Sequence, residues 1–454
     1  MNDVPAPTRP ALAVAPGGLP LLGHALPFIR RPLQFMSSLS ACGDIVELRF
    51  GPKKNYLICN HDLVHQVLMN PRTFDKGGAL YEKPRLLLGN GLVTSGWQDH
   101  RSQRRLLQPM FHPRKIEDYA AMLAEEIDSF TASWQPGSVV DVTDAMHSLS
   151  ARMSIRTLFA NHVSEEGTAE LLHWLPVFLQ GVYERAFMPL AFLEKLPTPK
   201  NRRFELSVVR LRQLIKDSIH QARQSDANEH SLVSLILDAS DAKTQERLDD
   251  DEIRGQVENL LFASAATNGS ALAWCFHLLG QHPEIDEQLH DEAEQVLHGE
   301  QPGFRHLPQL ELTQRVFAET LRLYPPGWIF SRITTEEVDL GGTRLPAGST
   351  VLYSPYVLHH DATLFPAPER FDPNRWLPEQ RKLIPAHAWI PFAAGNRKCI
   401  GDGFATAESV LTIARIASRW RLRAVPGSTI RPQVHSTLSP GPVPMTIECR
   451  PSKR

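Results

Sequence analysis

Cysteine is scarce in this chain, and what there is lies scattered. The 454 residues contain five cysteines and no CxxC pair; they are Cys42, Cys59, Cys275, Cys399 and Cys449. Zinc sites and disulfide frameworks need closely spaced or regularly patterned cysteines, so the sequence indicates neither. Scattered free thiols fit a reducing compartment, and we expect a cytoplasmic protein.

An excess of charge of one sign is also missing. The chain has 48 Lys and Arg against 50 Asp and Glu residues, which gives a formal net charge of −2. A protein that binds nucleic acid usually carries a basic excess, so we expect no nucleic-acid partner. Hydrophobic residues make up 42% and charged residues 22%, which is ordinary for a globular protein.

The N-terminal region lacks a long apolar run. Its first 24 residues, MNDVPAPTRPALAVAPGGLPLLGH, contain too many prolines and too short an apolar stretch for a membrane anchor or a signal peptide. We expect residues 1–16 to form a disordered or extended lead-in and residues 17–454 to form a single domain without a membrane anchor.

Hydrophobic patterns predict a mainly α protein with small β elements. Helical patterns dominate from residue 96 to about residue 322. The other predicted elements are strands at 45–50 and 55–59, a helix at 61–70, an irregular loop at 76–95, strands at 332–340 and 349–353, an irregular stretch at 365–391, a helix at about 404–420 and a β-like tail.

One helix is expected to be unusually long. It begins near Asp249, which is spaced from Glu252 as a capping box, and it runs to Gly280, shortly before Pro283. At a rise of about 1.5 Å per residue it would extend on the order of 45 Å. Apolar residues lie around much of its circumference, so we expect it to be central.

The strongest motif lies at residues 392–401, which read FAAGNRKCIG, or F-x-x-G-x-R-x-C-x-G. Each fixed position suits a loop that presents a thiolate to a haem iron. Cys399 would bind the iron, and both the metal and the positive N-terminus of the next helix favour an anionic sulfur. A thiolate ligand pushes electron density onto the iron and favours O–O cleavage.

The other fixed positions support the same interpretation. Gly395 permits a tight turn that a Cβ would strain, and Gly401 lets the backbone approach the porphyrin closely. Phe392 would pack beside the sulfur and exclude water, and Arg397 would pair with a haem propionate. The alternative is a buried structural cysteine, which five matches in ten residues disfavour. No CxxCH sequence is present, so the haem would not be held covalently.

Two upstream motifs extend the pattern. Glu319 and Arg322 form E-x-x-R on one helix face, and residues 368–376 read PERFDPNRW. E-x-x-R alone is weak evidence, because most such pairs are solvated surface contacts. Together with the cysteine loop, in this order and at these spacings, the motifs resemble the cytochrome P450 family along nearly the whole chain.

The resemblance implies the cytochrome P450 fold and haem b with an axial thiolate. It also implies a buried charged triad of Glu319, Arg322 and Arg370, which would fix the cysteine loop without taking part in catalysis. Trp97 and Arg101, which lie four residues apart, and Arg332 would meet the haem propionates. The simpler alternatives are core packing for Trp97 and a surface charge for Arg332.

The long helix departs from the family pattern. Where the family has Ala/Gly-Gly-x-Asp/Glu-Thr, residues 263–268 read ASAATN. Thr267 is the expected catalytic residue, because its hydroxyl would bond a water that delivers protons, and Ala263 on the same face would lie over the porphyrin. Ser264 replaces glycine and would bond the carbonyl one turn back. Ala266 replaces the acid, so either ordered water and Thr267 suffice or the chemistry is altered.

The expected substrate pocket is apolar. Its proposed lining includes Trp328, Phe330 and Leu438, with Asn259 as one polar contact, although each of these residues would also suit an ordinary core. Residues 323–332 and 387–399 resemble bacterial P450s of terpenoid biosynthesis, which suggests a sesquiterpene-like substrate.

The resemblance implies a monooxygenase that converts RH, O2, two electrons and two protons into ROH and water. No flavin or iron–sulfur domain is evident, so ferredoxin and a ferredoxin reductase would deliver electrons from NAD(P)H. Arg104, Arg105 and Lys398 would face an acidic ferredoxin, or would simply form a solvated charged face. The alternatives are a P450 that couples rings or rearranges a polyketide or other natural product, and a haem-thiolate binding protein that does not turn over.

Overall fold

The computed structural model describes residues 12–187, 194, 196–224, 231–240 and 247–450. Most of the expected lead-in, residues 1–11, therefore lies outside the described residues. The chain forms two compact units. Unit 1 comprises Met1–Glu82, Trp328–Glu369 and Lys382–Lys398, and unit 2 comprises Lys83–Gly327, Arg370–Arg381 and Cys399–Arg454. The expectation of a single domain stays a prediction.

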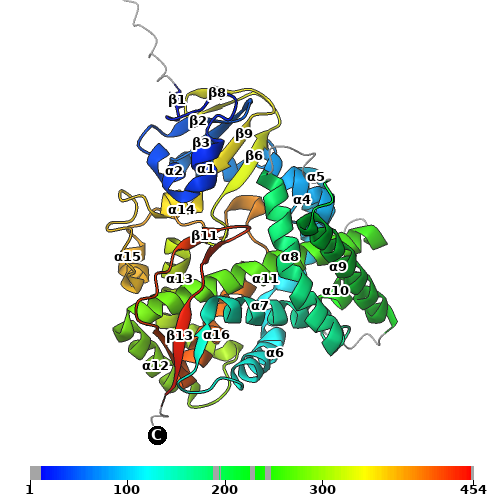
Figure 1. Ribbon diagram of the computed structural model, residues 1–454, viewed down its shortest axis with the longest axis vertical. Coiled ribbons are helices and arrows are strands. Elements are labelled where there is room, and N and C mark those ends of the chain that lie inside the picture. Colours follow the sequence, from blue (N-terminus) through cyan, green and yellow to red (C-terminus); the bar gives the residue numbers. More distant parts are fainter. Residues whose placement is uncertain (1–11, 188–193, 195, 225–230, 241–246, 451–454) are drawn as a thin grey trace, which may run out of the picture. The chain divides into compact units, whose positions relative to one another are not determined.

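Unit 1 is built on a six-stranded sheet of order β1-β2-β3-β9-β6-β4 (Figure 1). Its strands are β1 (Ala13–Val14), β2 (Ile45–Phe50), β3 (Lys53–Ile58), β4 (Phe74–Asp75), β6 (Phe330–Thr334) and β9 (Thr350–Tyr353). The other elements are α1 (Ala25–Arg30), α2 (Pro32–Leu39), α3 (His61–Met69), the β7–β8 hairpin (Val338–Leu340 and Thr343–Leu345), α14 (Pro355–His359) and the short helix η5 (Gly395–Arg397).

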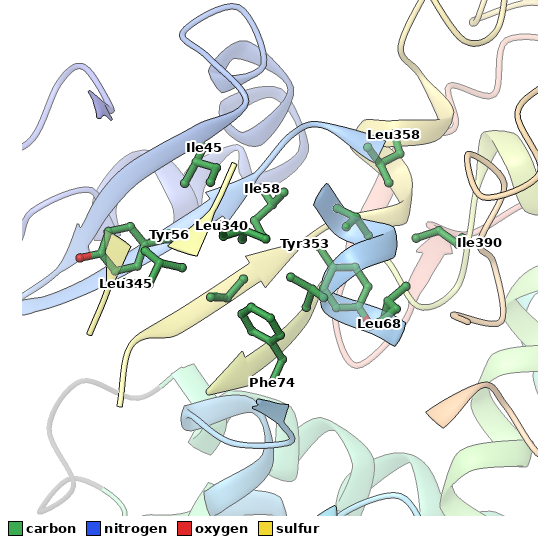
Figure 2. Close-up of a cluster of buried hydrophobic side chains, with 13 residues drawn as sticks. Ile45, Tyr56, Ile58, Leu68, Phe74, Leu340, Leu345, Tyr353, Leu358 and Ile390 are labelled. Carbon is green, nitrogen blue, oxygen red and sulfur yellow. The ribbon is translucent and has the colours of Figure 1, made fainter. Parts of the chain in front are cut away.

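A hydrophobic cluster holds unit 1 together (Figure 2). Val64, Val67 and Leu68 of α3 recur at helical spacing and pack into it, while Ile58 and Tyr353 come from the paired strands β3 and β9. Burial of such side chains contributes on the order of 2 kcal/mol each. The cluster therefore fixes α3 against the sheet.

Unit 2 is mostly helical. Its helices are α5 (Trp97–Leu107), η1 (Gln108–Phe111), α6 (Pro113–Thr131), α7 (Val142–Phe159), α8 (Glu165–Phe187), α9 (Pro199–Gln224), α10 (Leu232–Asp238), α11 (Asp250–Gln281), α12 (Pro283–Leu297), η3 (Phe304–Gln309), α13 (Glu311–Leu323), η4 (Pro373–Trp376), α15 (Pro378–Arg381) and α16 (Asp402–Arg419). Its strands are β5 (Val139–Asp141), β10 (Trp420–Ala424), β11 (Pro432–Val434), β12 (Leu438–Pro440) and β13 (Pro444–Cys449), in the sheets β10-β13-β5 and β11-β12.

The long central helix is confirmed as α11. Asp249 and Glu252 form the predicted capping box, in which each side chain accepts a hydrogen bond from the other residue's main-chain N–H. Gly269 allows α7 to pack closely, because a Cβ at this position would lie 2.7 Å from the Cα of His147. Between residues 253 and 280, Ala263 is the only exposed residue.

Several sequence predictions need correction. The loop expected at 76–95 contains α4 (Ala79–Leu88), because its leucines and charged residues are good helix formers and its glycines lie outside the helix. The strand expected at 332–340 is divided into β6 and β7 by residues 335–337. Among the described residues, every helix is too short or too polar to span a lipid bilayer.

Candidate functional site

Cys399 lies just before α16 in unit 2. Its side chain is exposed, and the helix begins three residues later at Asp402, so its sulfur lies near the positive end of the helix dipole. Arg104 of α5 is close enough to interact electrostatically with Cys399 and Asp402. Burial lowers the pKa of Arg104, and these two neighbours act in the opposite sense. The sulfur therefore has a cationic neighbour that favours a thiolate.

The turn before the cysteine depends on Gly395. Its φ is +66°, and a Cβ at this position would lie 2.4 Å from the carbonyl oxygen of Leu68 in α3. Both observations confirm the prediction that a side chain would strain this turn. The glycine therefore allows the loop to approach α3 within unit 1.

The middle of α11 presents small side chains and bonded hydroxyl groups. Ser264 donates to the carbonyl oxygen of Leu260 at 2.9 Å, which confirms the bond predicted from its substitution for glycine. Thr267 donates to the carbonyl oxygen of Ala263 at 2.8 Å, so its oxygen still has lone pairs that accept a further hydrogen bond. Ala263 is exposed and Thr267 is partly exposed, in a helix that is mostly buried from residue 253 to residue 280.

A buried acid on α16 escaped the sequence analysis. Glu408 is almost completely buried, and desolvation raises the pKa of its carboxyl group to about 8, although the nearby Asn268 acts in the opposite sense. Asn268 directly follows Thr267 on α11. The only feature of the sequence that could have indicated this buried acid is a glutamate among the apolar residues of a predicted helix.

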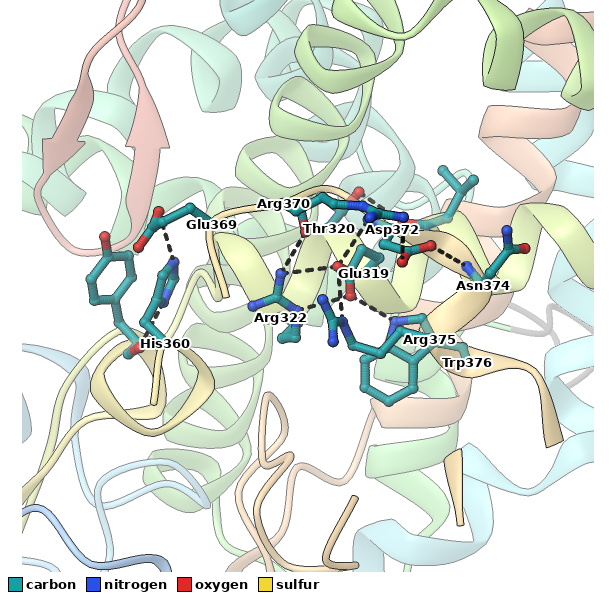
Figure 3. Close-up of polar contacts among 12 residues, drawn as sticks. Glu319, Thr320, Arg322, His360, Glu369, Arg370, Asp372, Asn374, Arg375 and Trp376 are labelled. Atoms are coloured by element: carbon teal, nitrogen blue, oxygen red, sulfur yellow. Dashed lines mark hydrogen bonds and ion pairs between the residues drawn. The ribbon is translucent and has the colours of Figure 1, made fainter. Parts of the chain in front are cut away.

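Glu319 is the centre of a buried polar network in unit 2 (Figure 3). Arg322 donates to both of its carboxylate oxygens at 2.9 Å, and neither of these side chains is exposed. Trp376 donates to Glu319 at 2.9 Å, and the main-chain N–H of Asp372 donates at 3.1 Å. The network fixes α13 to the segment that contains η4.

The prediction that Arg370 is the third member of the buried triad is wrong. The side chain of Arg370 is 70% exposed and pairs with Asp372, and only its carbonyl oxygen accepts a hydrogen bond from Arg322, at 3.1 Å. Arg375 is the side chain that reaches Glu319, at 3.4 Å. Both arginines lie in the PERFDPNRW motif, and sequence alone does not show which of them points inward.

The arginines expected to meet propionates have different surroundings. In unit 1, Arg332 is buried and donates to the carbonyl oxygen of Ser331 at 2.7 Å, and no described carboxylate lies within ion-pair distance. Arg397, also in unit 1, is buried and pairs with Asp75. In unit 2, Arg101 is exposed, and its guanidinium lies 5.8 Å from the Trp97 ring centre.

These observations fit a haem. A buried guanidinium needs an anionic partner, and among the described residues Arg332 has none at ion-pair distance, although Asp75 interacts with it from farther away. An exposed thiol at a helix N-terminus is a suitable iron ligand, and an exposed alanine on α11 leaves room for a flat ring. Phe392 is partly exposed, and Gly401 caps α16. The roles of these residues stay predictions.

Three of the residues predicted for the substrate pocket are buried by the protein itself. Asn259 is buried, and its side-chain amide makes hydrogen bonds with the end of α4 and the loop that follows. It donates to the carbonyl oxygen of Leu88 at 2.9 Å and accepts from the main-chain N–H of Val93 at 3.1 Å. Trp328 packs near Phe28, with ring centres 6.1 Å apart. Leu438 is fully buried. These side chains have almost no accessible surface, and their role in a substrate pocket stays a prediction.

Phe330 is the exception among the pocket predictions. Its ring is partly exposed and stacks on Tyr353 at 5.4 Å. Its role as a pocket residue therefore stays a prediction.

The Glu319 network allows a direct stability test. Replacing Arg322 with Met should lower the free energy of unfolding by about 3–5 kcal/mol, because it leaves a buried carboxylate without its main partner. Arg375→Met should lower the free energy of unfolding by a smaller amount. Arg370→Ala should change the free energy of unfolding by less than about 0.5 kcal/mol, because the guanidinium of Arg370 is exposed. Denaturant titration of the three variants measures this order. A large loss in Arg370→Ala would restore Arg370 to the triad.

Comparisons with known proteins agree with the motifs. A model of the family described as cytochrome P450 matches residues 14–447. Cyclooctat-9-en-7-ol 5-monooxygenase of Streptomyces melanosporofaciens is 48% identical over 98% of this chain and 97% of that protein. Pentalenene oxygenase of Streptomyces avermitilis is 41% identical over 93% of this chain and 94% of that protein.

A solved structure supports the predicted fold. The crystal structure of the cytochrome P450DA haem domain aligns with a TM-score of 0.87 at 23% identity, covering 97% of this chain and 98% of that one. The family model spans nearly the whole sequence, and the relatives match it over nearly their full lengths. The chain therefore belongs to the cytochrome P450 family, whose members bind haem b through a cysteine thiolate.

Proposed function

We propose that the protein hydroxylates a hydrophobic, terpenoid small molecule, with Cys399 as the thiolate ligand of its haem. The observation that carries this proposal is the exposed thiol at the start of α16, within the motif that identifies the family. The reaction would convert RH, O2, two electrons and two protons into ROH and water. When bound, the haem supplies the chemistry of dioxygen activation.

The chain's own residues would position and neutralise the cofactor. Arg101, Arg332 and Arg397 would neutralise the propionates, with Trp97 as a packing partner. Of the two buried arginines, Arg397 already pairs with Asp75, so Arg332 is the one that most needs an anion. Phe392 would exclude water from the sulfur, and Gly401 would allow close approach of the backbone.

Thr267 would hold the water that delivers protons. Its hydroxyl already donates to the carbonyl oxygen of Ala263, so its remaining lone pairs accept from water. No acid lies among residues 263–268, so water and this hydroxyl would have to suffice. The alanine at position 266, where the family has an acid, is also the reason for the alternative proposal of an enzyme that couples rings or rearranges its substrate.

The names of the relatives support the substrate class. One is named for the oxidation of cyclooctat-9-en-7-ol and another for pentalenene, which are respectively an unsaturated alcohol and an alkene. A molecule of this kind offers few polar groups for recognition, so apolar contacts would largely determine its orientation.

Ferredoxin and ferredoxin reductase are the proposed electron donors. Arg105 and Lys398 are exposed, and Arg104 interacts electrostatically with Cys399. A basic surface near the sulfur would attract an acidic ferredoxin. All five cysteines are free, which supports a cytoplasmic location.

Replacing Cys399 with Ala tests the proposed iron ligand. The variant should lose both turnover and the absorption that a thiolate-bound haem gives when it is reduced and bound to CO, because no other ligand would donate the same charge. Cys42→Ala is the matched control, since Cys42 is also exposed, and it should retain both properties. Unchanged absorption in Cys399→Ala would reject the proposal.

The ratio of product formed to NADPH consumed tests the proposed role of Thr267 in proton delivery. Thr267→Ala should lower this ratio by roughly tenfold, the effect expected from one lost hydrogen bond of about 1.4 kcal/mol, whereas Thr267→Ser should preserve it. Ala266→Asp should leave the ratio unchanged if water and Thr267 suffice. A clear increase in Ala266→Asp would show instead that the missing acid limits the natural enzyme.

Charge reversal tests the ferredoxin surface. Arg105→Glu should lower kcat/KM for ferredoxin by about tenfold at low ionic strength and by less at high salt, because salt screens exposed charges. Lys216→Glu makes the same change at an exposed position on α9 and should have little effect. Equal effects of the two substitutions would argue against a specific docking surface.

A further inference from the structure

Unit 1 contains a cluster of imidazole and carboxylate groups that the proposed function does not use. His61 and Asp62 are the first two residues of α3, and His387 lies in the segment that leads to Arg397. Each residue offers one ligand atom, and these three atoms all lie within 4.8 Å of one another. The cluster therefore brings together side chains that are far apart in sequence.

The three side chains converge on one carboxylate oxygen. Nε2 of His387 lies 2.7 Å from Oδ1 of Asp62, and Nε2 of His61 lies 3.8 Å from the same oxygen. The two imidazole rings stack nearly parallel, with centres 5.1 Å apart. His387 and His61 together lower the pKa of the Asp62 carboxyl group, with the His387 hydrogen bond as the largest cause.

A hydrogen bond between His387 and Asp62 does not account for the whole arrangement. In the described part of the chain, the ring nitrogens of His61 make no hydrogen bond, although the ring is mostly buried. A third imidazole, that of His65, lies one turn along α3, with its ring centre 4.7 Å from that of His387. The Nδ1 atom of His65 is buried without a hydrogen-bond partner among the described residues.

We propose that His61, Asp62 and His387 bind a divalent transition-metal ion of the Zn²⁺ type. Two imidazoles and a carboxylate suit Zn²⁺, whereas Ca²⁺ and Mg²⁺ prefer oxygen ligands. Ligand atoms around a tetrahedral Zn²⁺ lie about 3.3 Å apart, given bonds of about 2.0–2.1 Å. The observed separations of 2.7 and 3.8 Å lie on either side of that value, so small side-chain movements would complete the site.

The bound ion would join two segments of unit 1. His61 and Asp62 belong to the helix that packs into the hydrophobic cluster, and Ile390, three residues after His387, belongs to the same cluster. The segment continues to Phe392 and Gly395, and Gly395 approaches the carbonyl oxygen of Leu68 at the end of α3. A metal at the start of α3 would therefore hold this segment at a second point.

Calorimetric titration of the full-length holoenzyme with ZnCl2, after removal of any polyhistidine tag, tests the proposal. The wild type should bind one equivalent with micromolar or tighter affinity, and Zn²⁺ should raise its Tm. His387→Gln retains an amide N–H that donates to Asp62, but it removes a metal ligand. It should weaken binding by at least about 100-fold, because even partners outside the ligand shell affect metal affinity by 10–100-fold.

Two further variants make the outcome decisive. His61→Ala has no hydrogen bond to lose and should weaken Zn²⁺ binding equally, so it also serves if His387→Gln folds poorly. His220→Ala, at an exposed position on α9, should bind Zn²⁺ like the wild type. With Cu²⁺ as the probe, electron paramagnetic resonance should show coupling to two imidazole nitrogens. Absence of Zn²⁺ binding by the wild type, or equal binding by the His61→Ala/His387→Gln double variant, would overturn the proposal.

Discussion

A buried carboxylate with all its hydrogen bonds made is the constraint on which unit 2 depends. Glu319 carries a charge that is fully removed from water, and it is tolerated because Arg322, Arg375, Trp376 and the main chain of Asp372 donate to it. A carboxylate has about four lone-pair sites, and these donors occupy them. Any shift of α13 against the segment 370–376 would leave the Glu319 carboxylate without some of its donors, so the network holds these two segments together.

The same principle operates in α11 with neutral groups. The hydroxyls of Ser264 and Thr267 are bonded to carbonyl oxygens of their own helix, so neither hydroxyl group is left unsatisfied. Ala266, one turn along from Ala263, is a second small and partly exposed residue of this helix. The middle of the helix is therefore largely buried, and its accessible residues are Ala263, Ser264, Ala266 and Thr267.

The sequence predicted features that depend on local chemistry. The capping box of α11, the strained turn at Gly395 and the Ser264 hydrogen bond each follow from a few neighbouring residues, and all three are present. Features that depend on which way a side chain points in the folded protein were predicted less well. Arg370 and Arg375 are equally basic within one motif, and only the path of the backbone decides which one reaches Glu319. Asn259 is likewise used by a loop distant in sequence.

Glu408 has a consequence for the conditions in which the protein is most stable. The pKa of its carboxyl group rises from the ordinary value of 4.5 to about 8 on folding, so between these pH values the folded protein retains a proton that the unfolded chain releases. A raised carboxyl pKa opposes folding once the unfolded chain ionises, so this group lowers the free energy of unfolding as pH increases through that window. Mildly acidic buffers should therefore suit the purified enzyme better than alkaline ones, as far as this side chain is concerned.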